Sequence, residues 1–528
     1  MRYCGFNRNF PNLFLCLNRI DFPALILILF SCFSAPVVTA QSENNPEIKK
    51  LVKQATKLTR SGSLEQSEAL LHRAIELDDN RTDLKLELAF VFNKQRRIRE
   101  AYDICYAVAK AEPQNSHAFA VLGVTLLTAG RFDDARLVLF NAIKMNRKEH
   151  LAWAAYGMLD FYENRIDDSL ANLHQAVHYE PNEPDYLFSL AQVSARSENY
   201  REAAEAYDRF LHLPNNADAD RRARIKGLIE FLRYLGDIST LYAPNGSLET
   251  SIPFELVNNR PIVKLRINGS DKPLNFVLDT GSGISVISLD SAKRLKVKSV
   301  AKGGFARGLG GDGKFEINYG ILREINIGAV GIRNVPVYLR KFHTDGQAID
   351  GYIGLALISK FLTTIDYGNR SFSLTRKDVD AKEFRDNGAL SLPLRLTSSG
   401  FLSGEVLLKG IETPLNFIVD TGASISVISA QVAKTDGITP FANEERLRVI
   451  GSAGVTEDVQ SFHLPLVTFG SHSRKNITAV ALDLDLINEA SGFEQSGILG
   501  GNFLKDYRLT FDFKNSKVTF VLVRPEKD

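Results

Sequence analysis

The sequence predicts a multidomain protein in which an all-α N-terminal half precedes two related, mainly-β lobes that pair as a pseudo-dimer. Small residues recur every 34 positions through the first half, and such a period is typical of a helical solenoid. Short alternating apolar runs punctuated by glycine fill the second half, as expected for strands. One stretch, PLNFVLDTGSGISVIS, returns 141 residues later as PLNFIVDTGASISVIS.

Length and composition are those of a globular protein with several cores. At roughly 150 residues per domain, 528 residues suggest three or four units. Apolar residues make up 44% and charged residues 24% of the chain, which is ordinary for a globular protein. The formal net charge of +2 arises within residues 1–40. The near-neutral remainder offers no electrostatic surface for nucleic acid, so we expect no nucleic-acid partner.

Residues 1–40 are predicted to be a signal peptide or an N-terminal membrane anchor. Three arginines precede the apolar run 24–30, and small residues end the segment at Ala40. The run is short for a bilayer span, which needs roughly 20 residues. Three of the four cysteines lie in this leader, so only Cys105 remains beyond it and no internal disulfide can form there. We expect an exported protein that is periplasmic, secreted or anchored at the cell envelope.

The helical half spans residues 46–215 and contains five units. Two sets of small residues each keep the 34-residue step, namely Ala55, Ala89, Gly123, Gly157 and Ala191, and then Ser67, Ala101, Ala135, Ser169 and Ala203. This pattern resembles the tetratricopeptide repeat. The resemblance implies a superhelix of helix pairs whose groove holds a peptide or a protein partner, with a spacer or oligomerisation role as the alternative. Residues 216–235 are predicted to form a capping helix, and residues 236–250 a linker.

No metal or cofactor is expected. His174 and His178 stand at i and i+4, as in a zinc-protease helix, but Gln175 replaces the glutamate that such a site needs as general base. We therefore interpret both as surface histidines of the helix. No other His, Cys, Asp or Glu group shows metal-ligand spacing.

The duplication in the strand-rich half extends to whole lobes, predicted over residues 251–385 and 386–528. Gly351-Tyr-Ile-Gly354 in the first lobe corresponds to Gly497-Ile-Leu-Gly500 in the second. Each lobe runs in order through an apolar strand into Asp-Thr-Gly, a glycine-bearing hairpin, and a hydrophobic-hydrophobic-Gly segment. The lobes resemble retropepsin-like aspartic proteases, and the resemblance covers about half the chain. It implies a catalytic pair formed by Asp279 and Asp420, with Gly354 and Gly500 as core supports.

Each Asp-Thr-Gly triplet has a physical role. Gly281 and Gly422 let the backbone turn sharply so that each aspartate leaves its sheet. The family arrangement implies a reciprocal grip in which Thr280 and Thr421 bind the partner lobe. Two adjacent carboxylates cannot both ionise cheaply and therefore share one proton. The sequence does not show which of the two is the acid.

The glycine-rich hairpins are predicted to be mobile flaps over the pair. The first carries Gly308, Gly310, Gly311 and Gly313, and the second carries Gly451 and Gly454. The first also matches Gly-x-Gly-x-x-Gly, but a strand pattern follows where a nucleotide loop needs a helix. Neither hairpin shows a tyrosine or an obvious apolar tip residue.

The leading hypothesis is an aspartic endopeptidase that cleaves a peptide or protein substrate held extended between lobes and flaps. The incomplete flaps and the large repeat module motivate an alternative, a catalytically inactive peptide-binding or scaffold protein. A third possibility is that lobes pair between two copies of the chain. The tandem duplication favours pairing within one chain, because tethering raises effective concentration.

Overall fold

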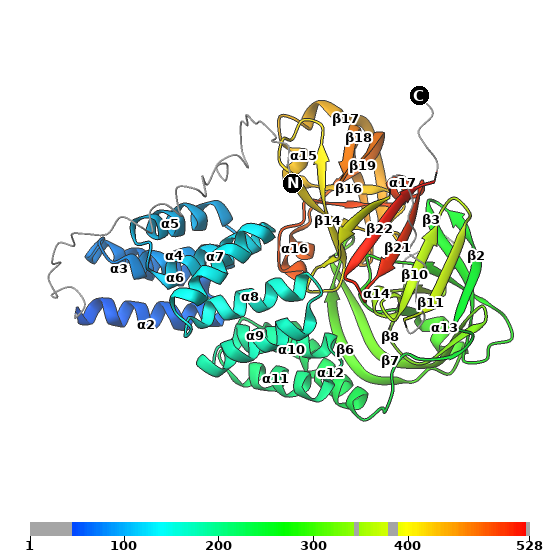
Figure 1. The fold of residues 1–528 in the computed structure, drawn as a ribbon, viewed down its shortest axis with the longest axis horizontal. Coiled ribbons are helices and arrows are strands. Elements are labelled where there is room, and N and C mark those ends of the chain that lie inside the picture. Colours follow the sequence, from blue (N-terminus) through cyan, green and yellow to red (C-terminus); the bar gives the residue numbers. More distant parts are fainter. Residues whose placement is uncertain (1–44, 343–347, 378–388, 524–528) are drawn as a thin grey trace, which may run out of the picture.

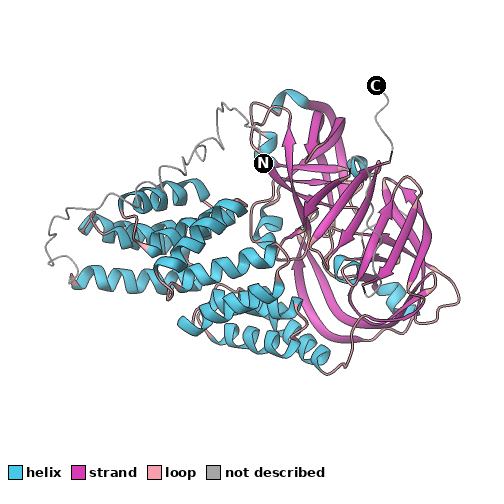
Figure 2. Cartoon of the chain, viewed as in Figure 1, coloured by secondary structure: helices cyan, strands magenta, loops and turns pink. Residues whose placement is uncertain are grey.

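A computed structural model describes residues 45–342, 348–377 and 389–523. Helices fill one half of the molecule and strands the other (Figure 2). The predicted leader, residues 1–40, lies outside the described residues. Among the residues that are described, no helix is long and apolar enough to cross a membrane.

Five helix pairs stack along the N-terminal half (Figure 1). They are α2 Pro46–Ser61, α3 Leu64–Leu77, α4 Thr82–Lys94, α5 Ile98–Ala111, α6 Ser116–Thr128, α7 Phe132–Met145, α8 His150–Tyr162, α9 Ile166–Tyr179, α10 Pro184–Arg196 and α11 Tyr200–His212. The recurring small residues are buried between paired helices. A Cβ on Gly157 would lie 2.9 Å from Leu173 Cγ, so the close approach of α8 and α9 requires glycine.

Two β lobes form the other half. Lobe 1 contains β2 Glu249–Val257, β3 Arg260–Ile267, β4 Leu274–Leu278, β5 Val286–Ser288, β6 Ser299–Arg307, β7 Lys314–Ile327, β8 Val330–Arg340, β9 Gly351–Ile353, β10 Phe361–Asp366 and β11 Ser371–Arg376. Lobe 2 contains β12 Leu390–Pro393, β13 Arg395–Leu396, β14 Leu402–Leu408, β15 Leu415–Val419, β16 Ser426–Ser429, β17 Ala442–Ile450, β18 Val455–Phe469, β19 His472–Leu482, β20 Gly497–Leu499, β21 Tyr507–Asp512 and β22 Lys517–Leu522. Short helices α13 Leu289–Arg294, α14 Leu355–Ile358, α15 Ala430–Ala433, α16 Asp485–Ser491 and α17 Gly501–Leu504, with the 3-10 turn Thr439–Phe441, complete the lobes. Strands β10 and β21 pair antiparallel and join the two lobes in one sheet.

The predicted linker 236–250 is wrong in its second half. Residues Ala243–Gly246 form strand β1, which pairs antiparallel with β8 of lobe 1. Strand β2 already begins at Glu249. Because strand pairing joins residues about 90 positions apart here (Ala243 with Arg333), the local composition did not reveal it.

Helix α12, Ala219–Gly236, follows the last repeat and does more than cap it. Its Gly227 faces the backbone of β6 so closely that an added Cβ would overlap the carbonyl of Lys302. Phe231 stacks on Tyr319 of β7 with ring centroids 4.7 Å apart. The helix therefore docks the repeat array onto the strands of the first hairpin (Figure 1).

Gly227→Ala is expected to destabilise the chain by about 1–3 kcal/mol, because backbone atoms on both sides must move to admit the methyl group. The measurement is the free energy of unfolding in urea. Gly236→Ala, in the same helix, is the control, since its Cβ would meet only the flexible side chain of Arg201 at 3.0 Å. Equal effects of the two substitutions would contradict the docking role of Gly227.

A phenylalanine of lobe 2 also packs inside the repeat array. Phe493 is fully buried and packs edge-on against Phe132, with ring centroids 4.9 Å apart, and against Tyr162 at 5.1 Å. The backbone N–H of Glu494 donates to the carbonyl of Thr128 at 2.9 Å. One apolar cluster thus contains residues of both modules.

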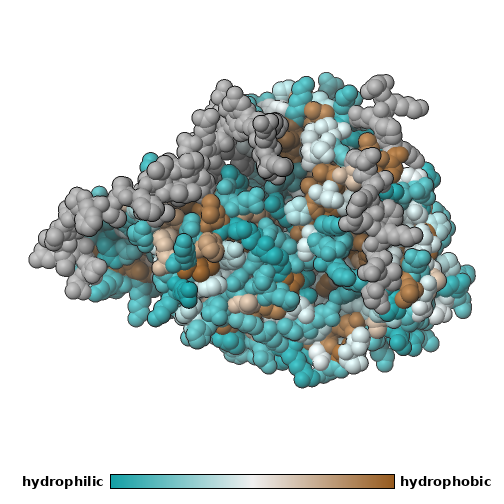
Figure 3. Space-filling view, viewed as in Figure 1, coloured by the Kyte–Doolittle hydropathy of each residue, from teal (hydrophilic) through white to brown (hydrophobic). Residues whose placement is uncertain are grey.

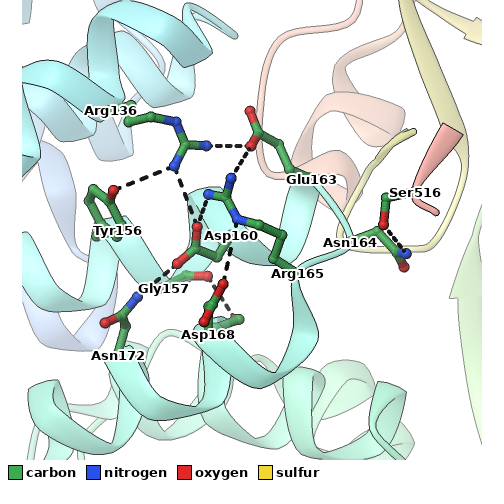
Figure 4. A network of polar contacts seen from close by, with 11 residues as sticks. Arg136, Tyr156, Gly157, Asp160, Glu163, Asn164, Arg165, Asp168, Asn172 and Ser516 are labelled. Atoms are coloured by element: carbon green, nitrogen blue, oxygen red, sulfur yellow. Dashed lines mark hydrogen bonds and ion pairs between the residues drawn. The ribbon is translucent and has the colours of Figure 1, made fainter. Parts of the chain in front are cut away.

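A polar network holds the turn between α8 and α9 against lobe 2 (Figure 4). Asp160 is 1% exposed and pairs with Arg165 and, at 3.6 Å, with Arg136. Asn164, in the same turn, donates to Ser516 Oγ at 3.0 Å and to the carbonyl of Phe513 at 3.3 Å. Buried ion pairs of this kind define a local geometry more than they add stability. Outside such contacts the visible face of the molecule is mainly hydrophilic, with scattered apolar patches (Figure 3).

Candidate active site

Both aspartates follow a central strand of their lobe. Strand β4 pairs in parallel with β9, and β15 pairs in parallel with β20. The N–H of Asp279 donates to the carbonyl of Ile353 at 3.0 Å, and that of Asp420 to the carbonyl of Leu499 at 2.9 Å. The same interaction in both lobes places each carboxyl at the equivalent strand end.

Gly354 and Gly500 lie directly behind the two aspartate loops. A Cβ on Gly354 would lie 2.7 Å from the carbonyl oxygen of Ser282, and one on Gly500 would lie 2.5 Å from that of Ile425. Each glycine N–H donates to a serine hydroxyl of its own lobe at 3.1 Å. These glycines allow the backbone to pass under the loops.

The two threonines bind the opposite lobe reciprocally. Thr280 Oγ1 donates to the carbonyl of Val419 at 2.7 Å and accepts from the N–H of Thr421 at 3.0 Å. Thr421 Oγ1 donates to the carbonyl of Leu278 at 2.7 Å and accepts from the N–H of Thr280 at 3.1 Å. Both threonines are fully buried. The lobes therefore pair within one chain.

Thr421→Val is expected to destabilise the protein by about 2–5 kcal/mol, since it leaves a buried N–H and a buried carbonyl without partners. Urea unfolding measures the loss. The control is Thr363→Val, which removes one hydrogen bond to Ile358 inside lobe 1 at an equally buried threonine. Equal losses in the free energy of unfolding for the two variants would contradict the role of Thr421 in holding the lobes together.

The carboxyls of Asp279 and Asp420 meet across the pseudo-twofold axis. A Cβ on Gly281 would lie within 2.6 Å of Asp420 Oδ1, and a Cβ on Gly422 within 2.6 Å of Asp279 Oδ1. Only glycine lets each loop approach the opposite carboxyl this closely. The N–H of Gly281 donates to Asp279 Oδ1 at 3.0 Å, and that of Gly422 to Asp420 Oδ1 at 2.7 Å.

The structure distinguishes the two aspartates. Burial raises the pKa of Asp279 well above its usual range, and the neighbouring charge of Asp420 raises it further. Burial also raises the pKa of Asp420, but backbone N–H groups of Gly422 and Ala423 and a hydrogen bond from Asp279 act in the opposite direction. Hydrogen bonds to a carboxylate favour its charged form. Asp420 accepts backbone hydrogen bonds from Gly422 and Ala423, whereas Asp279 accepts one from Gly281, and this difference favours Asp420 as the charged member of the pair.

The two glycine hairpins meet above the pair. The N–H of Ala453 donates to the carbonyl of Leu309 at 2.8 Å, and that of Gly311 to the carbonyl of Val455 at 3.2 Å. Positive φ angles at the tips occur at Gly310, Gly311, Gly313 and Gly454. Gly308 and Gly451 complete the tips, where an added Cβ would contact the opposite hairpin.

The expectation that neither hairpin has an apolar tip residue is wrong. Leu309 and Ile450 both line the cavity under the tips. They occupy equivalent positions, 141 residues apart, immediately before Gly310 and Gly451. The hairpins are recognised in the sequence by their glycines, and that pattern does not single out these two apolar residues.

A cavity of about 1180 Å³ surrounds the aspartates. Its walls include both lobes, both hairpins and, unexpectedly, helices α9, α10 and α12 of the repeat array. Arg196 of α10 lines this wall, and burial lowers the pKa of its guanidinium to about 10. It lies 4.6 Å from the ring centroid of Phe161. No local sequence signal marked Arg196, because its place depends on how the array docks.

His174 and His178 of helix α9 are exposed surface residues. His174 Nε2 lies 2.7 Å from Glu202 Oε1, and His178 stacks edge-on against Tyr179. Over the described ranges, no group of three His, Cys, Asp or Glu side chains is placed to hold a metal ion.

Comparison with known proteins assigns both modules. The aspartyl protease family matches residues 263–357 and 405–503, one segment in each lobe. The tetratricopeptide repeat matches residues 155–220. The chain carries a two-segment aspartyl protease domain fused to tetratricopeptide repeats. The protease segments contain Asp279 and Asp420, and the repeat segment contains helices α9 and α10 of the cavity wall.

Individual relatives are distant. The chain is 22% identical over 160 residues to anaphase-promoting complex subunit 3 of Schizosaccharomyces pombe, and these residues are 30% of this chain and 24% of that protein. The chain thus spans about a quarter of that relative's length. Among solved structures, the aspartic proteinase from Irpex lacteus is 14% identical with a TM-score of 0.35, over 52% of this chain and 97% of that chain. A tetratricopeptide-repeat protein from Thermus thermophilus is 20% identical with a TM-score of 0.30, over 34% of this chain and 98% of that chain.

Proposed function

We propose that the chain is an aspartic endopeptidase that hydrolyses peptide bonds through Asp279 and Asp420. The observation that carries the proposal is the facing pair of carboxyls, one from each lobe, under joined hairpins. Asp420 holds the charge and removes a proton from a water molecule between the carboxyls. Asp279 donates its proton to the oxygen of the scissile carbonyl as the water attacks. General acid–base catalysis of this kind is worth about 10²- to 10⁴-fold in rate.

The test is cleavage of a proteome-derived peptide mixture by the chain from Gln41 onward, across pH 3–8, followed by mass spectrometry. A statine-type transition-state analogue should inhibit the cleavage, because it occupies the position of the tetrahedral intermediate. Absence of any cleavage over this pH range would instead support a peptide-binding scaffold.

We propose further that the repeat array recruits the substrate or a partner protein. Tetratricopeptide arrays bind peptides and proteins through extended concave surfaces, and the relative from Schizosaccharomyces pombe is by its name a subunit of a complex. The array also contributes one wall of the cavity. Deleting the first repeat, residues 45–78, should lower the cleavage rate of a protein substrate more than that of a short peptide.

Export to the periplasm, to the medium or to the envelope surface remains our proposal for localisation, with a membrane anchor in residues 1–40 as the alternative to a cleaved signal. It rests on the basic, apolar and small-residue order of that segment. Fractionation of cells that express the full chain, with and without residues 1–40, tests it. Equal distribution of the two forms would overturn it.

A further inference from the structure

The two lobes present different side chains at equivalent positions beside the aspartates. In lobe 1, Ser288 of β5 is in register with Arg340 of β8. In lobe 2, Ser429 of β16 is in register with Leu482 of β19. Ser288 and Ser429 are themselves equivalent, 141 residues apart. Both Arg340 and Leu482 line the cavity, so its two sides differ by a charge.

Arg340 is held in place without an acidic partner. Its guanidinium lies 4.5 Å from the ring centroid of Phe315 and 5.3 Å from that of Phe342. Nη1 donates to the carbonyl of Ser452, at the tip of the second hairpin, at 2.6 Å. Among the described residues no carboxylate forms an ion pair with it, and the acidic groups whose ionised forms would act on it are those of Tyr352 and Asp279.

Three other cations of the cavity wall are paired with carboxylates. Arg307 lies 3.0 Å from Glu489, Arg448 lies 2.9 Å from Glu457, and Lys360 contacts Glu198. Their charges are therefore largely neutralised by the protein itself. Arg340 differs from these three because the remaining donors of its guanidinium can still bind a carboxylate in two-point geometry.

Leu482 belongs to an apolar surface. Leu482 and Leu309 of the first hairpin tip both pack against a buried apolar cluster that contains Val480 and Ile498. This side of the cavity offers no charged donor at the position equivalent to Arg340. An aliphatic side chain is the group that such a surface binds best.

We propose that the lobe 1 side of the cavity binds an aspartate or glutamate side chain of the substrate through Arg340, while the lobe 2 side binds an aliphatic one beside Leu482. The preferred bond then joins an acidic residue to an aliphatic residue. This inference rests on the proposed peptidase function and narrows its substrate class. A neutral side chain on the lobe 1 side would leave the remaining donors of the guanidinium without a carboxylate, which costs affinity.

The test uses short peptides that differ only in glutamate or glutamine at one of the two residues flanking the cleaved bond, with leucine at the other. Both orders, Leu-Glu and Glu-Leu, are measured at pH 6, where glutamate is ionised. The readout is the ratio of kcat/KM for the glutamate peptide to that for its glutamine counterpart. This ratio is insensitive to a general loss of activity, so it remains informative if a variant closes its hairpins poorly.

In one order the native chain should prefer glutamate by about tenfold or more, as expected for a charge-assisted hydrogen bond. Arg340→Leu, which copies the lobe 2 residue, should bring the ratio to about one. Leu482→Arg should create a glutamate preference in the opposite order. Arg448→Leu is the matched control, because it removes a paired arginine of the same cavity, and it should leave the ratio unchanged.

A native ratio near one, or a ratio that Arg340→Leu leaves unchanged, would overturn the inference while the peptidase function stood. Should no peptide be cleaved, calorimetric binding of reduced-bond glutamate and glutamine peptides to native and Arg340→Leu chains decides the same question. A glutamate preference in binding that Arg340→Leu removes supports the Arg340 site even without turnover. Equal binding of the two peptides contradicts it.

Discussion

Asp279→Asn and Asp420→Asn are each expected to lower kcat for peptide hydrolysis by at least about 10³-fold, while the chain stays folded. An asparagine cannot share a proton with the remaining carboxylate, so either the base or the acid is lost. Steady-state cleavage of one peptide from the mixture measures the effect. Asp290→Asn, at an exposed aspartate of α13, is the control and should leave kcat unchanged. Cleavage that survives either dyad substitution would contradict the proposed mechanism.

Asp279→Asn should also alter the pH dependence of stability. Because the pKa of Asp279 is raised in the folded chain, its contribution to stability is fully present below about pH 4, its unfolded pKa. That contribution is lost as the pH rises through the folded value. As the pH rises above 4, the melting temperature of the native chain should therefore fall relative to that of Asp279→Asn. Thermal melts of both chains at pH 3 and pH 7 test this, and a constant difference between them would contradict the raised pKa.

The second large effect is expected at the joint between the repeat array and lobe 2. Phe493→Ala should lower the free energy of unfolding by about 3–5 kcal/mol, the usual cost of removing a buried phenyl group. The phenyl group is fully buried between Phe132 and Tyr162, so its loss leaves a void inside the array. Urea unfolding gives the magnitude, and limited proteolysis shows whether the modules separate.

Phe140→Ala is the control for this joint, since Phe140 lies in the same array but is 54% exposed. Its substitution should change stability by no more than about 0.5 kcal/mol. Separation of the modules should also reduce cleavage, because α9, α10 and α12 wall the cavity. Unchanged proteolysis and unchanged activity in Phe493→Ala would show that the array docks by other contacts.

Much of the fold follows from local sequence patterns. Small residues such as Gly157 mark each helix pair because paired helices can approach only where the side chain is small. Each Asp-Thr-Gly triplet ends in glycine because that residue lies against the opposite carboxyl. In each case one contact dictates the residue type. The same contact recurs in every helical repeat or in both lobes, so the required residue recurs at a fixed spacing and can be recognised in the sequence.

Features that depend on docking are absent from those patterns. Residues 243–246 join the sheet of lobe 1, Arg196 reaches the cavity wall, and Arg340 faces the aspartates without an acidic partner among the described residues. Each results from one long-range packing arrangement that occurs once. A long-range contact that occurs once produces no periodic pattern in the sequence, so it cannot be predicted from composition or residue spacing.

The paired aspartates, their threonines and their glycines can thus be identified from the chain alone, because the duplication of a lobe repeats each of them. The unequal hydrogen bonding of the two aspartates and the charge difference between the two sides of the cavity emerge only on folding. Both depend on which backbone N–H groups and which side chains surround a carboxyl in three dimensions. Electrostatic interactions act through space over several ångströms, and the distances that govern them are set by tertiary packing.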